Sequence, residues 1–188
     1  MTETQHILAN PAPLGLMGFG TTTVLLNLFN AGLIADTGLG TIFAMGLFFG
    51  GIAQVIAGIF EFRKGNTFGM TAFTSYGMFW IALVAIFQFH GMGWAKDADN
   101  VSLACFLGIW GLFTLFMFIA SLKKNLVLML VFGTLVILFF LLAIGHLINA
   151  PIVLTIAGYE GLLCGLLAIY LAGAEIINDS FGKKMLPV

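Results

Sequence analysis

A few ionisable and amide side chains interrupt the long apolar stretches of this sequence, and their chemistry stands out. Glu61, Glu160 and Glu175 are carboxylic acids, and Gln54 carries an amide. A carboxyl group in apolar surroundings without a cationic partner favours its protonated form, so each glutamate is a candidate proton carrier. For Glu160 and Gln54 the alternative is a hydrogen bond to a neighbouring helix that serves packing alone.

The segment 10–14 places an asparagine and two prolines directly before the first apolar run. An asparagine side chain accepts a hydrogen bond from the first helical turn, and proline suits the first helical positions, so we expect a helix to begin near Pro13. Its free N–H groups carry partial positive charge and can hold a carboxylate. The alternative is that the segment only ends a polar tail and starts a helix. The candidate anion site consists of Asn10, Pro11, Ala12, Pro13 and Leu14.

Three hydroxyl side chains stand close together after a glycine-containing stretch, near the expected start of the third helix. There Thr71, Thr74 and Ser75 can face the same vestibule as Asn10, together with unpaired N–H groups. The alternative for each hydroxyl is a bond to its own helix backbone. No lysine or arginine lies within the expected spans, so we expect an anion path built from helix starts, hydroxyl groups and amides.

The elements that position these residues are membrane helices. The 188 residues are 61% hydrophobic and 8% charged, and their mean hydropathy is +1.11, far outside the range of soluble domains. A spanning helix needs about 20 apolar residues, so this length allows about six spans. We predict one all-α transmembrane domain over 1–188, with tails 1–12 and 178–188 and helices at 13–34, 40–61, 71–90, 102–122, 125–148 and 151–177.

The basic residues predict the orientation of the six spans. Two lysines or arginines follow the second, the fourth and the sixth helix, and only Lys96 falls on the opposite side. Positive charge is retained on the cytoplasmic side of a membrane, so we expect both termini in the cytoplasm and the protein in the inner (plasma) membrane.

Glycines recur at helical spacing, as at Gly46 and Gly50 or Gly161 and Gly165, and such stripes let helices approach closely. We therefore expect close packing within the bundle and a homo-oligomer.

The pattern Leu-Gly-x-x-Gly-x-x-Thr occurs at 14–21 and again at 107–114. This suggests a 3+3 inverted repeat, with chance similarity as the alternative.

Several function classes lack support in this sequence. The net charge of -1 offers no basic patch for nucleic acid. Paired acidic sites, nucleotide loops and metal-spaced His or Cys clusters are missing, so we predict no enzyme, no metal and no cofactor. Energy for transport would then come from a gradient. Cys105 and Cys164 fall in apolar runs and are expected to be buried thiols.

Two motifs carry a resemblance to a known family. The pattern Asn-Pro-Ala-Pro-Leu-Gly-Leu-x-Gly-Phe at 10–19 and the block Gly-Asn-Thr-Phe-Gly-Met-Thr-Ala-Phe-Thr-Ser-Tyr-Gly at 65–77 are typical of the acetate uptake transporters. The similarity continues through 142–145 to Phe181 and Gly182. The chain thus resembles that family, which includes the bacterial succinate-acetate permeases.

The resemblance implies a membrane permease for acetate and related small carboxylates, with succinate included, coupled to protons and assembled as a hexamer. It also implies a constriction of Phe19, Tyr76 and Leu135, which excludes water, and an influence of Ala168 on substrate size. Three alternatives remain: a passive anion channel for the same substrates, a water or neutral-solute channel, and a haem-binding redox subunit that would use His90 and His146.

Overall fold

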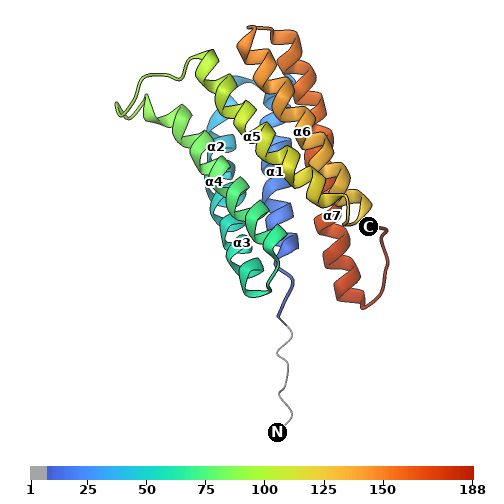
Figure 1. Cartoon of the computed structure of the whole chain (residues 1–188). Helices are drawn as coiled ribbons and strands as arrows, with labels where there is room; N and C mark the ends of the chain where they lie inside the picture. Colours follow the sequence, from blue (N-terminus) through green and yellow to red (C-terminus); the bar gives the residue numbers. More distant parts are fainter. Residues whose placement is uncertain (1–7) are drawn as a thin grey trace.

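The computed structural model of the chain describes residues 8–188, which form a bundle of tilted helices (Figure 1). Six helical segments are long and apolar enough to span a membrane, as predicted. Five of them are single helices, whose ends lie within about four residues of the predicted ends. The six spans are α1 (Ala12–Asn30), the composite segment Asp36–Arg63, α4 (Thr67–Phe89), α5 (Asn100–Ser121), α6 (Leu126–Leu147) and α7 (Pro151–Phe181).

The second span is more complex than the single helix expected at 40–61. It starts with a short 3-10 turn and then passes from α-helix to π-helix and back. A Cβ added to Gly51 would lie 2.7 Å from the Ile81 side chain, so the widened turn is packed tightly against α4. π-helical turns are rare and are frequent at functional sites. The four parts are η1 (Asp36–Gly38), α2 (Leu39–Met45), η2 (Gly46–Ala53) and α3 (Gln54–Arg63).

The third span begins four residues before the predicted start, which corrects the expected position of the hydroxyl residues. The Asn66 side chain accepts a hydrogen bond from the Gly69 N–H at 3.2 Å and therefore caps α4. Gly65 precedes it with a φ of +72°, a conformation that glycine adopts without strain. Thr71, Thr74 and Ser75 consequently lie inside α4 and not among its free N–H groups.

The tails are also shorter than predicted. The first helix begins at Ala12, with Pro11 at its N-cap position, and the Asn10 side-chain oxygen accepts a hydrogen bond from the Ala12 N–H at 3.3 Å. Residues 1–7 of the predicted N-terminal tail lie outside the described residues. At the other end α7 continues to Phe181, so residues 178–181 belong to the helix and not to the tail. Gly182, with a φ of +61°, ends that helix.

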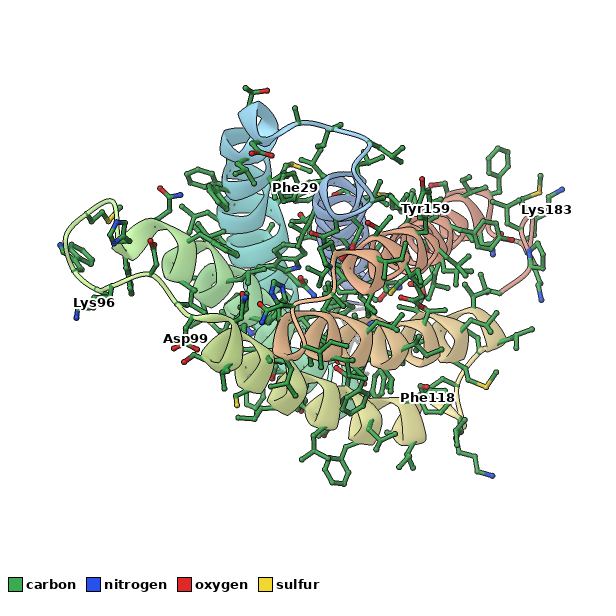
Figure 2. All side chains as sticks on the ribbon, turned by 90° about the horizontal axis from the view of Figure 1, so that it is seen from above. Phe29, Lys96, Asp99, Phe118, Tyr159 and Lys183 are labelled. Atoms are coloured by element: carbon green, nitrogen blue, oxygen red, sulfur yellow. The ribbon has the colours of Figure 1, made fainter. Side chains whose placement is uncertain are left out.

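Glycines bring the first and last spans into close contact. A Cβ on Gly158 of α7 would lie 2.3 Å from the Ala31 backbone nitrogen. Gly20 and Gly165 face each other, because a Cβ on either one would lie within 2.8 Å of the other's carbonyl oxygen. Figure 2 shows the upper ends of these two helices side by side. The predicted close helix contacts at small residues are therefore present.

The glycines at matching positions of the two copies of the repeated pattern pack differently. A Cβ on Gly15 would strike the Phe73 ring at 2.5 Å, whereas the matching Gly108 has nothing within 4 Å. The 3+3 inverted repeat thus stays a prediction.

The two ends of the bundle differ in charge. Six basic residues end or follow the helices that run toward the end where α1 and α4 begin, which we call the basic end: Arg63, Lys64, Lys123, Lys124, Lys183 and Lys184. Lys96 lies in the loop between α4 and α5 (Figure 2), and this loop is at the opposite end because α4 ends there and α5 begins there. In that loop Asp99 caps α5, and the hydrogen bonds from the Ser102 N–H and hydroxyl hold the pKa of Asp99 below its usual range.

The outer faces of the bundle are apolar. Ile109, Phe116 and Ile152 are among the many large apolar side chains that are exposed on the monomer. Cys105 is exposed as well, which corrects the expectation that both cysteines are buried, whereas Cys164 is buried as expected. A multi-pass membrane protein presents such faces to lipid tails or to neighbouring subunits.

Candidate functional site

A cavity of about 210 Å³ opens at the basic end, between α1, α3, α4, α6 and α7. Its entrance is polar and its deep wall is apolar. The entrance contains Asn10, Glu61, Asn66, Lys124 and Glu175, and the apolar wall contains Leu16, Phe19, Tyr76, Val131, Phe132 and Leu135. This cavity therefore combines residues from both family motifs.

A chain of hydrogen bonds fixes Asn10 at the entrance. The Asn10 amide nitrogen donates to the Glu175 carboxylate at 2.9 Å, and the Lys64 ammonium donates to the Asn10 side-chain oxygen at 3.0 Å. The same oxygen accepts from the Ala12 N–H. Asn10 thereby links the start of α1 to the end of α7 and to the turn after α3. Asn10 is thus engaged with Glu175, Lys64 and the Ala12 N–H, and the anion site predicted at this helix start stays a prediction.

Glu61, at the inner side of the entrance, is fully buried in α3. One of its carboxylate oxygens, Oε2, accepts a hydrogen bond from the Asn66 amide at 2.8 Å, and the other, Oε1, has no partner among the described residues. A Cβ on Gly69 would lie 2.9 Å from the Glu61 carboxyl carbon. Glycine at position 69 leaves room for Glu61, because any side chain there would displace the Glu61 carboxyl group.

The proposed constriction residues share one wall of the cavity. Phe19, Tyr76 and Leu135 come from α1, α4 and α6, and each is at most 6% exposed. The Phe19 and Tyr76 ring centroids are 5.9 Å apart, and Phe132 adds a third ring 6.1 Å from that of Tyr76. The structure thus brings these side chains together, and their role as a constriction stays a prediction.

Tyr76 is held in place from behind. Its hydroxyl donates to the Thr114 hydroxyl at 2.9 Å, and Thr114 donates in turn to the Trp110 carbonyl oxygen at 2.7 Å. The Phe113 ring packs against Tyr76 with centroids 5.4 Å apart. These contacts from α5 fix the ring that faces the cavity.

Gln54 also lines the cavity and is 1% exposed. Its side-chain oxygen has no hydrogen-bond partner among the described residues. Gln54 is the first residue of α3, directly after the π-helical turn, which widens the helix just before this position. The amide can offer both an acceptor and donors to a ligand in the cavity.

Several predicted site residues do not line this cavity. Thr74 packs against α3, where a Cβ on Gly58 would lie 2.2 Å from its hydroxyl, and Thr71 and Ser75 are only partly buried elsewhere on α4. The earlier helix start gives these residues the faces of mid-helix positions. Among the described residues, Pro11 and Leu14 border a separate groove near Phe60 and Arg63, and Pro13 borders neither space.

Ala168 and Glu160 lie on α7, away from the lining of the cavity. Ala168 is fully buried, so a larger side chain there would have to displace its neighbours. Both carboxylate oxygens of Glu160 are buried without a hydrogen-bond partner among the described residues. The proton-carrier role of Glu160 therefore has no connection to the cavity in this structure.

One lysine at the entrance and one beside it add positive charge to the path that was expected to rely on helix starts, hydroxyl groups and amides. Lys124 lines the cavity, and its ammonium nitrogen lies 5.5 Å from the centre of the Phe68 ring. Lys64 is held by Asn10. Both lie outside the predicted spans, so the absence of basic residues within the spans says nothing about the entrance. The predicted orientation of the spans already placed these lysines at one end, and short loops at the same end of a bundle meet around its entrance.

Comparisons with known proteins agree with this arrangement. The family model described as GPR1/FUN34/yaaH matches residues 1–186. The Escherichia coli K12 protein called succinate-acetate/proton symporter SatP is 56% identical over 182 residues, which cover 96% of this chain and 95% of that protein. Acetate permease A of Emericella nidulans is 35% identical over 195 residues, covering 96% of this chain and 65% of that longer protein.

A solved structure described as the bacterial acetate channel SatP has the same fold. It superposes with a TM-score of 0.94 at 54% sequence identity, covering 97% of this chain and 99% of that one. The match extends over all six spans, and the two family motifs surround one cavity here. The chain therefore belongs to the GPR1/FUN34/yaaH family.

Proposed function

We propose that this protein is a membrane permease for acetate and related small carboxylates, succinate included, and that it moves them together with protons. The observation that carries the proposal is the cavity at the basic end, with its polar, lysine-bearing entrance and its apolar inner wall. A carboxylate has one charged end and one apolar end, and this lining offers a matching surface to each.

The substrate path starts at the entrance and leads past Gln54 to the apolar wall. Lys124 and the amide of Asn10 attract the carboxylate, and Gln54 offers a hydrogen-bonding group inside the cavity. Phe19, Tyr76 and Leu135 then form the constriction, which excludes water and so disfavours highly charged solutes. Ala168 influences substrate size indirectly, through the packing of α7.

The alternative to proton symport is passive flow through a channel. The names of the relatives support both modes, because the E. coli protein is called a proton symporter and the solved structure an acetate channel. A passive channel for the same substrates would use the same cavity once the apolar wall opened. Proton symport is favoured by the two entrance glutamates, since Glu61 and Glu175 can carry protons into the cavity with the substrate.

We propose that the protein lies in the inner membrane with both termini in the cytoplasm. The basic end then faces the cytoplasm, in agreement with the retention of positive charge on that side. The exposed apolar faces support a homo-oligomer, and we propose a hexamer from the family resemblance.

The experiment is uptake of labelled acetate into proteoliposomes with the interior alkaline, compared with liposomes of equal internal and external pH. Protein-free liposomes give the flux of acetic acid through lipid, which is subtracted. We expect saturable, protein-dependent uptake that the pH gradient accelerates. Absence of protein-dependent acetate flux under both conditions would overturn the proposed substrate, and non-saturating flux that ignores the gradient would favour the channel.

A further inference from the structure

Two buried oxygen atoms without hydrogen-bond partners belong to side chains that line the same cavity. They are the side-chain oxygen of Gln54 and the Oε1 of Glu61. Both residues lie on α3, seven positions apart, so they share one helix face at a spacing of about 10 Å along the axis. Buried acceptors normally have partners, and an unpaired one costs about 1–3 kcal/mol. A small ligand that supplies a proton donor would satisfy each of them in turn as it moved along the cavity.

The residues around Glu61 leave its Oε1 open to a proton donor. Asn66 and Gly69 of the α4 start enclose the carboxyl group, and only the neutral Asn66 amide donates to it. The charged groups nearby are Glu175 of α7, whose carboxylate is bonded to Asn10, Lys124 at the entrance, and Lys64, which donates to Asn10. None of these lysines donates a hydrogen bond to Glu61 among the described contacts. The free Oε1 is therefore available to a proton shared with the substrate.

We propose that Glu61 exchanges a proton with the carboxylate of the substrate at the inner end of the entrance. This inference rests on the proposed function and names the residue that couples the substrate to the proton. The protonated Glu61 carboxyl group gives its proton to a substrate oxygen, the O–H bond of Glu61 breaks as that of the substrate forms, and Glu61 is left as a carboxylate. A proton from the solution at the entrance then restores the protonated side chain.

Chemistry and geometry both favour this step. The glutamate side chain and the substrate are both carboxylic acids, so the proton moves between groups of one chemical class. The O–H of the resulting neutral acid can donate to the free oxygen of Gln54, two turns back toward the start of α3. A neutral acid then meets the wall of Phe19, Tyr76 and Leu135, and it avoids the cost of moving a carboxylate into apolar surroundings. The basic residues at the entrance attract the anion before it is neutralised.

The test is Glu61→Gln in proteoliposomes, with Asp179→Asn as the matched control. Asp179 is an exposed carboxylate of α7 at the same end of the bundle, outside the cavity lining. Acetate uptake is measured under an imposed pH gradient and, separately, under a potassium-valinomycin potential. We expect wild-type uptake to follow the pH gradient and to ignore the potential, with one proton entering per acetate.

For Glu61→Gln we expect gradient-driven uptake to fall at least about tenfold, as for loss of a general acid, while Asp179→Asn stays within about twofold of wild type. Residual Glu61→Gln flux that follows the potential instead of the pH gradient also supports the proposal, since the anion then crosses without its proton. Gradient-driven uptake at the wild-type rate in Glu61→Gln overturns it. Wild-type flux driven by the potential also overturns it, but leaves a carboxylate channel intact. No protein-dependent flux in wild type means that the proposed function itself has failed.

A second variant covers the case in which Glu61→Gln does not fold. Gln54→Leu removes the second free acceptor and leaves the Asn66 cap untouched. We expect its gradient-driven uptake to fall at least about tenfold, for lack of an acceptor for the acid O–H. Its acetate-dependent thermal shift should persist, because the entrance is unchanged. Wild-type uptake by this variant would contradict the proposed role of the α3 face.

Discussion

Lys123 and Lys124 are adjacent in sequence but differ in position. Both are exposed between α5 and α6, yet only Lys124 lines the cavity, where it lies over the Phe68 ring. We predict that Lys124→Gln raises the acetate concentration for half-maximal uptake about two- to fivefold, the effect of losing one exposed charge. Lys123→Gln should leave it unchanged. Initial uptake rates over a range of acetate concentrations provide the measurement.

Salt separates an electrostatic role of Lys124 from a structural one. Exposed charges are screened within about 10 Å at 0.1 M salt, so the difference between Lys124→Gln and wild type should shrink as the salt concentration rises. A difference that persists at high salt, or an equal effect of Lys123→Gln, would argue against anion capture by Lys124.

At the residue scale, the sequence identified the cavity wall better than the entrance. Phe19, Tyr76 and Leu135 were expected together because the family resemblance implies a constriction at those positions, and Gln54 stood out as an amide in an apolar run. Asn66 did not stand out, because its role as helix cap depends on where α4 begins. Free oxygens, such as Oε1 of Glu61, are visible only once the neighbours are known.

At the scale of elements, the contact between α1 and α7 depends on glycine at Gly158. A Cβ there would lie 2.3 Å from the Ala31 backbone nitrogen, and backbone cannot move aside as a flexible side chain can. We predict that Gly158→Ala lowers the free energy of unfolding by about 1–3 kcal/mol or more, as overpacking does. The apparent Tm of the purified protein in detergent measures the change.

Gly173→Ala is the matched control on the same helix. Nothing lies within 4 Å of a Cβ at Gly173, so the added methyl group causes no clash. Replacing a mid-helix glycine by alanine favours the helix by about 0.5–1 kcal/mol. The control should therefore match or exceed the wild-type Tm. Equal Tm values for Gly158→Ala and wild type would show that α1 and α7 can separate without cost.

The number and order of the spans followed from apolar length, but their internal structure did not. The π-helical turn at Gly46–Ala53 has no signature in hydrophobic periodicity, because it depends on how three glycines pack against α1 and α4. The predicted start of α4 is four residues too late. Its first turn, Thr67–Met70, contains a threonine and a glycine, which are as typical of a loop as of a helix start. The Asn66 cap and the Gly65 turn decide the boundary.

At the scale of the whole molecule, the asymmetry of charge and the position of the cavity together determine which side of the membrane the cavity faces. The cavity opens at the basic end, so an orientation with that end in the cytoplasm makes this structure an inward-open state. The entrance lysines then face the cytoplasm, and Lys96 faces the outside. Orientation thus decides whether the cavity is where substrate is received or where it is released during uptake.

Single cysteines at Lys96 and Lys183 test this orientation. Both residues are exposed, in the α4–α5 loop and after α7 respectively (Figure 2), and the background carries Cys105→Ser because Cys105 is exposed. Cys164 is buried and can stay. We predict that a membrane-impermeant maleimide labels Lys96→Cys in intact cells, and labels Lys183→Cys only after the cells are broken open. The reverse pattern would contradict cytoplasmic termini, and it would make the cavity an outward-facing entrance from which Glu61 draws its proton directly from the medium.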